Sequence, residues 1–372
     1  MDRLHIAFFG PVNSGKSTLV NAIAGQEVSL VSEVPGTTTD PVRKAIELPG
    51  LGPCVLIDTA GLDDAGLLGA ERERRTRAVL DETDVAVLVG SPVTPDLIGG
   101  LRTAGIPIVS YERGQSVESL LQRIAAALPV EENRYLTGNL AKVGDSVVLV
   151  MPQDSEAPKG RLILPQVQVL RELLDRGCVP HCCTPDSLKS ALKSLEKAPD
   201  LVITDSQAFA FVNAAIPRDW PLTSFSILLA AAKGDMRVFL EGARAIDKLR
   251  PGDRVLIAEA CTHVPDTEDI GRVKIPALLR KKMADQTGHD VMPGGDRASL
   301  KIDIAAGNDF PEDLSAYSLI VHCGACVANA RLVRSRIRKA LLAGVPITNY
   351  GLALAHLQGI LDRVEIPGRG RE

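Results

Sequence analysis

The chain has 372 residues, 45% of them hydrophobic and 24% charged, which is the composition of a globular protein long enough for two or three domains. A net charge of −4 and 3% aromatic residues exclude the basic, base-stacking surface of a typical nucleic-acid binder. No apolar run is long enough to cross a bilayer, the amino end lacks a signal-peptide pattern, and seven cysteines suit metal ligation in a reducing compartment. We therefore expect a cytoplasmic protein with no nucleic-acid and no membrane partner.

The first motif is a phosphate-binding loop. His5–Phe9 predicts a strand that leads into Gly10–Ser17, which reads G-x-x-x-x-G-K-S, and Thr18–Ala24 predicts the helix that must follow. Backbone N–H groups of such a loop wrap phosphates, its lysine reaches the β- and γ-phosphates, and its serine ligates Mg²⁺. The predicted nucleotide-binding residues are Asn13, Ser14, Gly15, Lys16, Ser17 and Thr18.

Two further segments extend the nucleotide site. Val34–Asp40 is a polar loop in which Thr38 is the candidate for completing the Mg²⁺ shell. Val55–Gly61 predicts a strand that delivers Asp58 to the metal and then Gly61, which can approach the γ-phosphate closely. With Lys16, these three residues form the predicted catalytic set.

Together these motifs resemble the translation-factor class of GTPases, in the branch of the potassium-stimulated tRNA-modification GTPase. The resemblance implies that Asn13 helps to hold a K⁺ ion near the phosphates. Leu62 stands where a Ras-like enzyme carries its water-orienting glutamine, so we expect slow hydrolysis, roughly 10⁻² s⁻¹ or less.

The guanine-recognition motif Asn-Lys-x-Asp does not occur in the chain. After the strand predicted at Asp84–Gly90 there is room for one short helix before the next strand, Ile106–Tyr111. The segment Ile106–Leu128 resembles the last strand and helix of the fold. We expect a deletion that removed the guanine-reading strand, which leaves selectivity for GTP open.

The middle of the chain begins after a polar linker, Pro129–Gly144. Residues 146–204 alternate three apolar runs with two helical patterns, which predicts a small parallel βαβαβ unit. It carries no catalytic grouping, so docking or dimerisation is the favoured role. Cys182 and Cys183 are adjacent on a predicted strand and face opposite ways, so a metal site with Cys178 and His181 is not favoured.

The last part of the chain carries the pattern C-x-H … H-C-x-x-C. Its members are Cys261, His263, His322, Cys323 and Cys326. Each half follows an apolar run that predicts a buried parallel strand, so the ligands should converge beyond the carboxyl ends of the strands. Three cysteines suit an iron–sulfur cluster with one iron open to exchange, and the same set could hold zinc through Cys3His.

Four longer stretches carry a resemblance to the [FeFe]-hydrogenase maturation GTPase family (HydF). They are Glu156–Pro165, Ala258–His263, Asp269–Pro276 and Pro346–Gly351. The resemblance implies an α/β protein of three domains, each with a sheet. They are a shortened P-loop GTPase-like doubly wound domain (1–129), a dimerisation domain (140–225) and a parallel-sheet cluster-binding domain (235–365).

The resemblance also implies the function. It implies a homodimeric scaffold that carries a [4Fe–4S] cluster and a transient precursor of the hydrogenase diiron subcluster. The precursor would come through two radical-SAM maturases and pass to apo-[FeFe]-hydrogenase. It implies Cys261, Cys323 and Cys326 as thiolate ligands and an exchangeable fourth position, for which the candidates are His263, His322 and Glu268.

Three hypotheses compete. The first, which we favour, is an iron–sulfur scaffold that is also a GTPase, in which the state of the bound nucleotide alters how the chain docks its partners. It would bind GTP, Mg²⁺ and K⁺. The second is the same scaffold with a degenerate nucleotide domain that does not hydrolyse. The third is a zinc-structured GTPase that acts on tRNA or the ribosome, against which the acidic pI counts.

Overall fold

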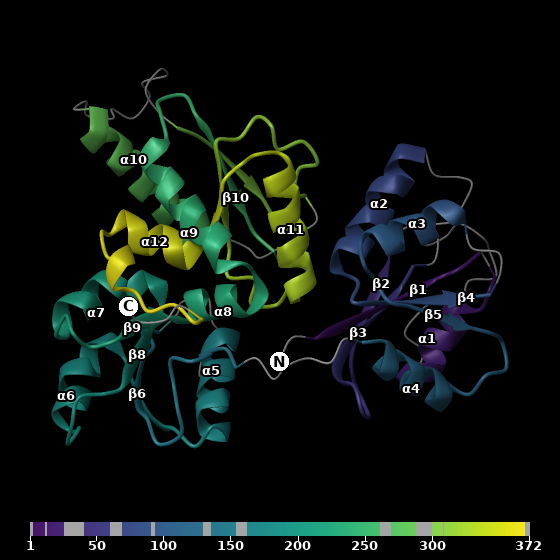
Figure 1. Ribbon diagram of the computed structural model, residues 1–372, viewed down its shortest axis with the longest axis horizontal. Helices are drawn as coiled ribbons and strands as arrows, with labels where there is room; N and C mark the ends of the chain where they lie inside the picture. Colours follow the sequence, from purple (N-terminus) through teal and green to yellow (C-terminus); the bar gives the residue numbers. More distant parts are fainter. Residues whose placement is uncertain are drawn as a thin grey trace. The chain divides into compact units, whose positions relative to one another are not determined.

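The computed structural model describes residues 3–11, 13–25, 41–59, 69–90, 94–128, 135–153, 162–260, 269–287, 300–307 and 309–368 (Figure 1). The chain divides into two compact units, Met1–Glu132 and Asn133–Glu372. Strands and helices alternate in both, which confirms the predicted α/β class. Among the helices of these residues, none has the length and apolar character needed to span a membrane.

The first unit contains a five-stranded sheet in the order β2-β3-β1-β4-β5, in which β2 runs antiparallel to β3 and the other pairs are parallel. Its strands are β1 (Leu4–Phe9), β2 (Val42–Leu48), β3 (Gly52–Asp58), β4 (Val85–Val89) and β5 (Ile108–Tyr111). Every residue of β4 is buried, as expected for a parallel strand covered on both faces.

Four helices cover the two faces of this sheet. They are α1 (Lys16–Ala24), α2 (Gly69–Glu82), α3 (Pro95–Thr103) and α4 (Val117–Ala127). Residues of α1 and α4 pack on one face and residues of α2 and α3 on the other, which makes the sheet doubly wound (Figure 1). Because β5 pairs directly with β4, the described sheet has the arrangement that loss of the guanine-reading strand would produce.

The second unit begins with a four-stranded parallel sheet in the order β7-β6-β8-β9. Its strands are β6 (Ser146–Val150), β7 (Val179–Cys183), β8 (Leu201–Thr204) and β9 (Leu222–Ser224). The first three form the predicted βαβαβ unit. The sequence analysis missed β9, which is an edge strand of three residues after Pro221, a residue tolerated beside edge strands.

The helices of this part are α5 (Leu164–Asp175), α6 (Leu188–Lys193), α7 (Phe209–Ala215) and α8 (Phe225–Lys233). Short 3₁₀ turns lead into two of them, at Pro185–Ser187 and Ser206–Ala208. Helix α8 is a buried connecting helix, with most of its residues inaccessible to solvent.

A second four-stranded parallel sheet follows in the order β11-β10-β12-β13. Its strands are β10 (Arg254–Ala258), β11 (Lys301–Ala305), β12 (Leu319–His322) and β13 (Ile347–Asn349). Its main helices are α9 (Met236–Ala245), α10 (Ile275–Thr287), α11 (Ala330–Leu342) and α12 (Tyr350–Leu357). Two further 3₁₀ turns lie at Ile246–Lys248 and Leu361–Arg363.

Side chains alternate across this sheet between two apolar layers. Leu256 and Ile320 pack in the layer that contains residues of α11, whereas Val255 and Leu319 pack in the layer that contains residues of α10. Figure 1 shows α11 on one side of β10 and α10 on the other. This alternation decides which residues can meet at the end of each strand.

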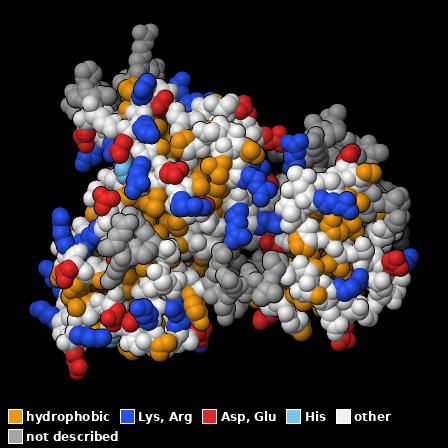
Figure 2. All heavy atoms as spheres, in the orientation of Figure 1, with side chains coloured by type: hydrophobic (Ala, Val, Ile, Leu, Met, Phe, Trp, Pro, Cys, Tyr) orange, Lys and Arg blue, Asp and Glu red, His pale blue; other side chains and the backbone are white. Residues whose placement is uncertain are grey.

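The two sheets of the second unit share one hydrophobic core. A single apolar cluster includes Val148 and Val202 from the first sheet and Leu256 and Ile320 from the second. Helix α8 joins them because it contacts both α11 and α12. On the face of this unit in view in Figure 2, basic and acidic side chains are interspersed.

Gly242→Ala should destabilise the second unit. In α9 an added Cβ would lie 2.0 Å from the Ile347 carbonyl oxygen of β13, so the helix would have to move off the sheet. We expect a loss of about 2 kcal/mol in the free energy of unfolding, measured by denaturant titration. The matched control is Gly99→Ala in α3, where the added Cβ meets nothing within 4 Å. That variant should gain up to ~1 kcal/mol of helix propensity, and equal effects of the two substitutions would contradict the close approach.

Candidate functional site

The phosphate-binding loop starts at the carboxyl end of β1. Gly10 lies so close to β4 that a Cβ would be 2.1 Å from the Val89 carbonyl oxygen, so this position requires glycine. Asn13 and Gly15 adopt left-handed conformations, with φ of 63° and 94°. Left-handed residues in such a loop turn N–H groups toward one point, which is the geometry of an anion-binding nest.

Helix α1 begins at this loop without a side-chain cap, because Gly15 is its N-cap. The free N–H groups and the positive end of the helix dipole are therefore available to an anion. Lys16 is buried, and its Nζ donates to the carbonyl oxygens of Gly10 (2.5 Å) and Pro11 (2.8 Å). Its ammonium thus lies back over the loop. The buried Ser14 hydroxyl has no hydrogen-bond partner among the described residues.

Asp58 stands beside this loop. It ends β3, where it pairs with Phe8 of β1, and only 1% of it is exposed. The neighbouring Thr59 hydroxyl donates to the Phe8 carbonyl oxygen (2.5 Å) and holds the two strand ends together. N–H donors, a lysine, the Ser17 hydroxyl and a carboxylate at one sheet edge form a donor set that fits a Mg²⁺-bound polyphosphate.

The loop after β5 joins this strand to α4. Arg123 of α4 donates to the Ser110 carbonyl oxygen (2.8 Å) and to Gln115 Oε1 (2.8 Å). The Tyr111 hydroxyl donates to the Gln115 carbonyl oxygen (3.2 Å). These contacts tie the loop to α4, and none of them involves a carboxylate.

The second candidate site lies at the carboxyl edge of the β11-β10-β12-β13 sheet. Cys323 follows β12, and its Sγ accepts from the N–H groups of Ala260 (3.1 Å) and Ala325 (3.4 Å). Donors directed at sulfur favour the thiolate over the thiol, and such bonds are typical of sulfurs in iron–sulfur sites. Ala260 precedes Cys261 in the sequence, so this bond joins Cys323 to the last described residue before the first predicted ligand.

A buried lysine fixes the turn that carries Cys326. Lys233 ends α8, is 2% exposed, and its Nζ donates to the carbonyl oxygens of Ala325 (2.8 Å) and Ala328 (2.7 Å). Ala325 has a φ of 51°, an uncommon conformation for a residue other than glycine. The ammonium group from α8 therefore holds both ends of a strained turn, and Cys326 within it is half-buried.

His322 is directed to the other face of the sheet. Its Nε2 accepts from Arg336 Nη1 of α11 (3.1 Å), so its Nδ1 carries the proton and donates to the Cys323 carbonyl oxygen (2.8 Å). Burial, and then the nearby Arg336 guanidinium, lower the pKa of His322 to about 3. Arg336 also donates to the carbonyl oxygens of Glu259 (3.1 Å) and Gly307 (2.5 Å). In this arrangement neither nitrogen of His322 is available to a metal.

The other predicted site residues lie outside the described residues. They are Thr38, Gly61, Cys261, His263 and Glu268. Cys323 and Cys326 are the described part of the cysteine set, and within the described ranges no three His, Cys, Asp or Glu side chains form a metal-binding group. On β7, Cys182 is exposed, whereas burial raises the pKa of Cys183 to about 11.

The sequence analysis missed a buried polar cluster beside Cys323. Residues 270–274 form a π-helical turn (Ile270–Lys274), and Asp269 caps its start by accepting from the Arg272 N–H (2.7 Å). Arg272 Nη2 lies 2.9 Å from Glu259 Oε2, and its Nε lies 3.9 Å from Asp269 Oδ2. The sequence signal for this cluster was the family resemblance of two stretches, Asp269–Pro276 and Pro346–Gly351. The structure brings these two stretches together at the cluster, where Gly271 lies beside Tyr350.

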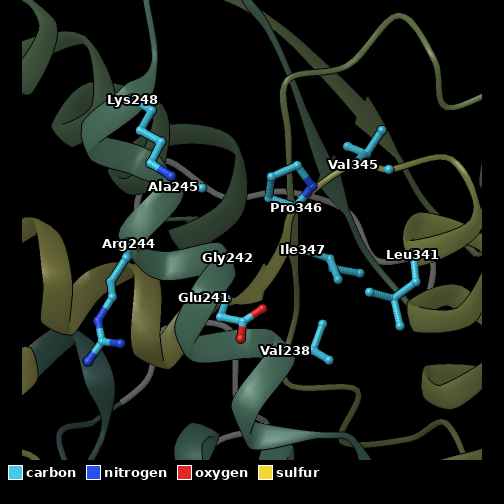
Figure 3. A pocket seen from close by; sticks show the side chains of 11 residues that line it. Val238, Glu241, Gly242, Arg244, Ala245, Lys248, Leu341, Val345, Pro346 and Ile347 are labelled. Carbon is cyan, nitrogen blue, oxygen red and sulfur yellow. The ribbon is translucent and has the colours of Figure 1, made fainter.

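A groove on the second unit lies apart from both sites. It has a volume of about 490 Å³ and runs between α9 and the segment that joins α11 to β13. Val238 and Glu241 of α9 face Leu341 and Ile347 across it (Figure 3). Its lining contains no cysteine or histidine.

Lys233→Met should weaken the cysteine site. The substitution keeps the apolar stem and leaves the Ala325 and Ala328 carbonyl oxygens without their ammonium donor. We expect a loss of about 2 kcal/mol of stability and about tenfold weaker retention of iron against a chelator after anaerobic reconstitution. Lys193→Met, at an exposed position of α6, is the matched control and should change neither. Unchanged iron retention in Lys233→Met would show that the turn holds its shape without the lysine.

Both compact units of the chain are similar to known proteins or protein families. The tRNA modification GTPase MnmE of Xanthomonas oryzae pv. oryzae is 47% identical over 89 residues, which are 24% of this chain and 20% of MnmE. MnmE of Acidiphilium cryptum is 38% identical over 143 residues, or 33% of this chain and 32% of MnmE. This chain therefore spans a third or less of the length of these relatives.

Among solved structures, the G domain of the T. maritima FeoB iron transporter matches with 22% identity and a TM-score of 0.24. The match covers 34% of this chain and 98% of that one.

Three family profiles match the chain. One described as 50S ribosome-binding GTPase matches residues 5–115, so the first unit is a P-loop GTPase domain. The hydrogen maturase F dimerization domain matches residues 136–234, and the hydrogen maturase F tetramerization domain matches residues 237–366. These two domains make up more than half of the chain, which therefore belongs to the hydrogen maturase F (HydF) family.

Proposed function

We propose that this chain is a nucleotide-gated carrier of iron–sulfur cargo in [FeFe]-hydrogenase maturation. It binds a [4Fe–4S] cluster through Cys261, Cys323 and Cys326, carries the precursor of the diiron subcluster, and transfers it to apo-hydrogenase. The observation that carries the proposal is the Cys323 sulfur. It accepts two backbone N–H groups at the carboxyl edge of a parallel sheet, in a chain of the HydF family.

The fourth coordination position is the exchangeable one. Both ring nitrogens of His322 are engaged within the protein, which leaves His263 and Glu268 as the candidates. An oxygen or nitrogen ligand at one iron suits a site that must accept a second metal fragment, because such a ligand is released more readily than a thiolate.

The first unit supplies the nucleotide switch. Lys16, Ser17 and the backbone of the loop hold the phosphates and Mg²⁺, Asp58 and Thr38 complete the metal shell, and Gly61 approaches the γ-phosphate. Asn13 holds K⁺, as in the MnmE-like branch. Hydrolysis is slow, and its product state changes how the chain docks its partners.

The partners follow from the same proposal. The dimerization and tetramerization domains make the chain a homo-oligomer, and we propose a homodimer built through residues 136–234 as the basic assembly. Two radical-SAM maturases supply the precursor, and apo-[FeFe]-hydrogenase receives it.

One observation favours a second candidate for the amino-terminal unit. Because β5 pairs directly with β4, and the chain lacks Asn-Lys-x-Asp, guanine selection has no recognisable support. In that case the unit binds a nucleotide as a structural module and does not hydrolyse it. Measuring phosphate release from GTP and ATP, with and without K⁺, distinguishes the hydrolysing switch from the structural module. Release at the background rate would contradict hydrolysis.

Anaerobic reconstitution tests the proposed cluster. Purified chain should take up about four irons and about four sulfides per chain and give an S = 1/2 EPR signal when reduced. Zinc bound in place of iron would contradict the cluster and favour a zinc-structured GTPase.

Cys323→Ser should lose most of the bound iron, because a serine hydroxyl is a poor replacement for a thiolate ligand at iron. Iron and sulfide assays after reconstitution measure the loss. Cys182→Ser is the matched control, since Cys182 is exposed on β7. Iron content equal in the two variants would remove Cys323 from the ligand set.

Lys16→Ala should weaken nucleotide binding by at least about a hundredfold, because it removes the cation that lies over the phosphate-binding loop. Titration with a fluorescent GTP analogue measures the affinity. The iron content of the same sample should remain that of the wild type. A variant that binds nucleotide normally would contradict the assignment of this loop.

A further inference from the structure

The Tyr350 hydroxyl is a buried hydrogen-bond donor whose partner is absent from the described part of the chain. Tyr350 opens α12, is 9% exposed, and its oxygen is inaccessible to solvent with no partner among those residues. Its ring belongs to the apolar layer against which Cys323 also packs. Buried hydroxyl groups nearly always have a partner, so this one requires an acceptor at this position.

The backbone beside the Tyr350 hydroxyl has room for it because residue 271 is a glycine. A Cβ added at Gly271 would lie 2.0 Å from the Tyr350 oxygen and 3.1 Å from Glu259 Oε1, so the π-helical turn passes directly over the hydroxyl. Asn349 accepts from the Leu352 N–H (2.9 Å) at the start of α12 and donates to Ser226 Oγ of α8 (3.2 Å). These contacts fix the start of the helix that carries Tyr350.

The groups around the Tyr350 hydroxyl keep it protonated, so that it can donate a hydrogen bond. Burial, followed by the charges of Cys323, Glu259 and Asp269, raises the pKa of Tyr350 well above its usual value, so it keeps its proton. Glu259 Oε2 is engaged by Arg272 (2.9 Å), and the hydroxyl makes no hydrogen bond to that carboxylate. Cys323 lies on this same face of the sheet, opposite to the face of His322.

We propose that Tyr350 is a positioning residue that donates its hydroxyl hydrogen bond to a sulfur atom at the Cys323 corner of the cluster site. The acceptor is an inorganic sulfide of the cluster beside Cys323, because the phenol makes no hydrogen bond to the Cys323 sulfur. This inference rests on the proposed cluster-binding function. A hydrogen bond to sulfur withdraws negative charge and favours the reduced cluster, so Tyr350 raises the reduction potential.

The test compares two tyrosine variants that each lose one oxygen atom. Tyr350→Phe removes the proposed donor, whereas Tyr317→Phe removes a hydroxyl that is hydrogen-bonded to Asp303, on a segment that precedes β12. Full-length wild type and both variants are reconstituted anaerobically, and the midpoint potential of each is titrated by EPR.

Tyr350→Phe should keep its iron and shift the equilibrium about tenfold toward the oxidised cluster, since a bond to a charged acceptor is worth about that factor. For one electron a tenfold change equals 59 mV, to more negative potential. Tyr317→Phe should match the wild type. Gly271→Ala, which displaces the phenol without removing it, should shift the potential in the same direction as Tyr350→Phe.

Resonance Raman spectra identify the acceptor, because heavy-isotope sulfide moves only the bands of the inorganic sulfides. The band altered by Tyr350→Phe should be one of these, and a change confined to the iron–thiolate bands would contradict the assigned acceptor. An iron-loaded Tyr350→Phe with wild-type potential and spectrum would overturn the inference and leave the proposed function intact. A wild-type chain that takes up zinc and no iron would overturn the proposed function and this inference with it.

Discussion

The ammonium group of Lys233 is the contact on which the cysteine site depends. Lys233 ends α8, which belongs to the dimerization domain. Its ammonium group donates to two carbonyl oxygens of the turn that carries Cys326 in the tetramerization domain. A buried ammonium without such acceptors is strongly unfavourable, so the helix and the turn are fixed together. The apolar core that the two sheets share also holds these two domains together. The site is therefore built by both domains, although its cysteines come from one.

Both candidate sites use the same property of parallel sheets. Strands that run in one direction end at one edge, and the loops beyond them bring together residues from distant parts of the sequence. In the first unit this edge joins Asp58 to the phosphate-binding loop through the pairing of β3 with β1. In the second it joins Ala260 to Cys323 through the pairing of β10 with β12. The backbone supplies the N–H groups in each case, to phosphate in one and to sulfur in the other.

The sequence predicted those features that depend on local pattern. Strands such as β4 and β6 were predictable because a strand buried on both faces is apolar at nearly every position. The orientation of His322 was not, since it depends on Arg336, which is 14 residues away on another element. The approach of Gly271 to Tyr350 was also hidden, because the two residues come from separate segments and meet only when α10 and α12 pack together.

The predicted ligands of the cysteine site come from two segments of the sequence. On the β12 side, Cys323 and Cys326 stand on a backbone fixed by Lys233, and the neighbouring His322 is directed to Arg336 on the other face. The remaining predicted ligands, Cys261, His263 and Glu268, all come from the one segment that follows β10. In the proposed carrier, a fourth ligand drawn from that segment would leave the metal without disturbing the sulfur ligands at β12. Those two sulfur ligands would then help to retain the cluster while one position is vacated for the cargo.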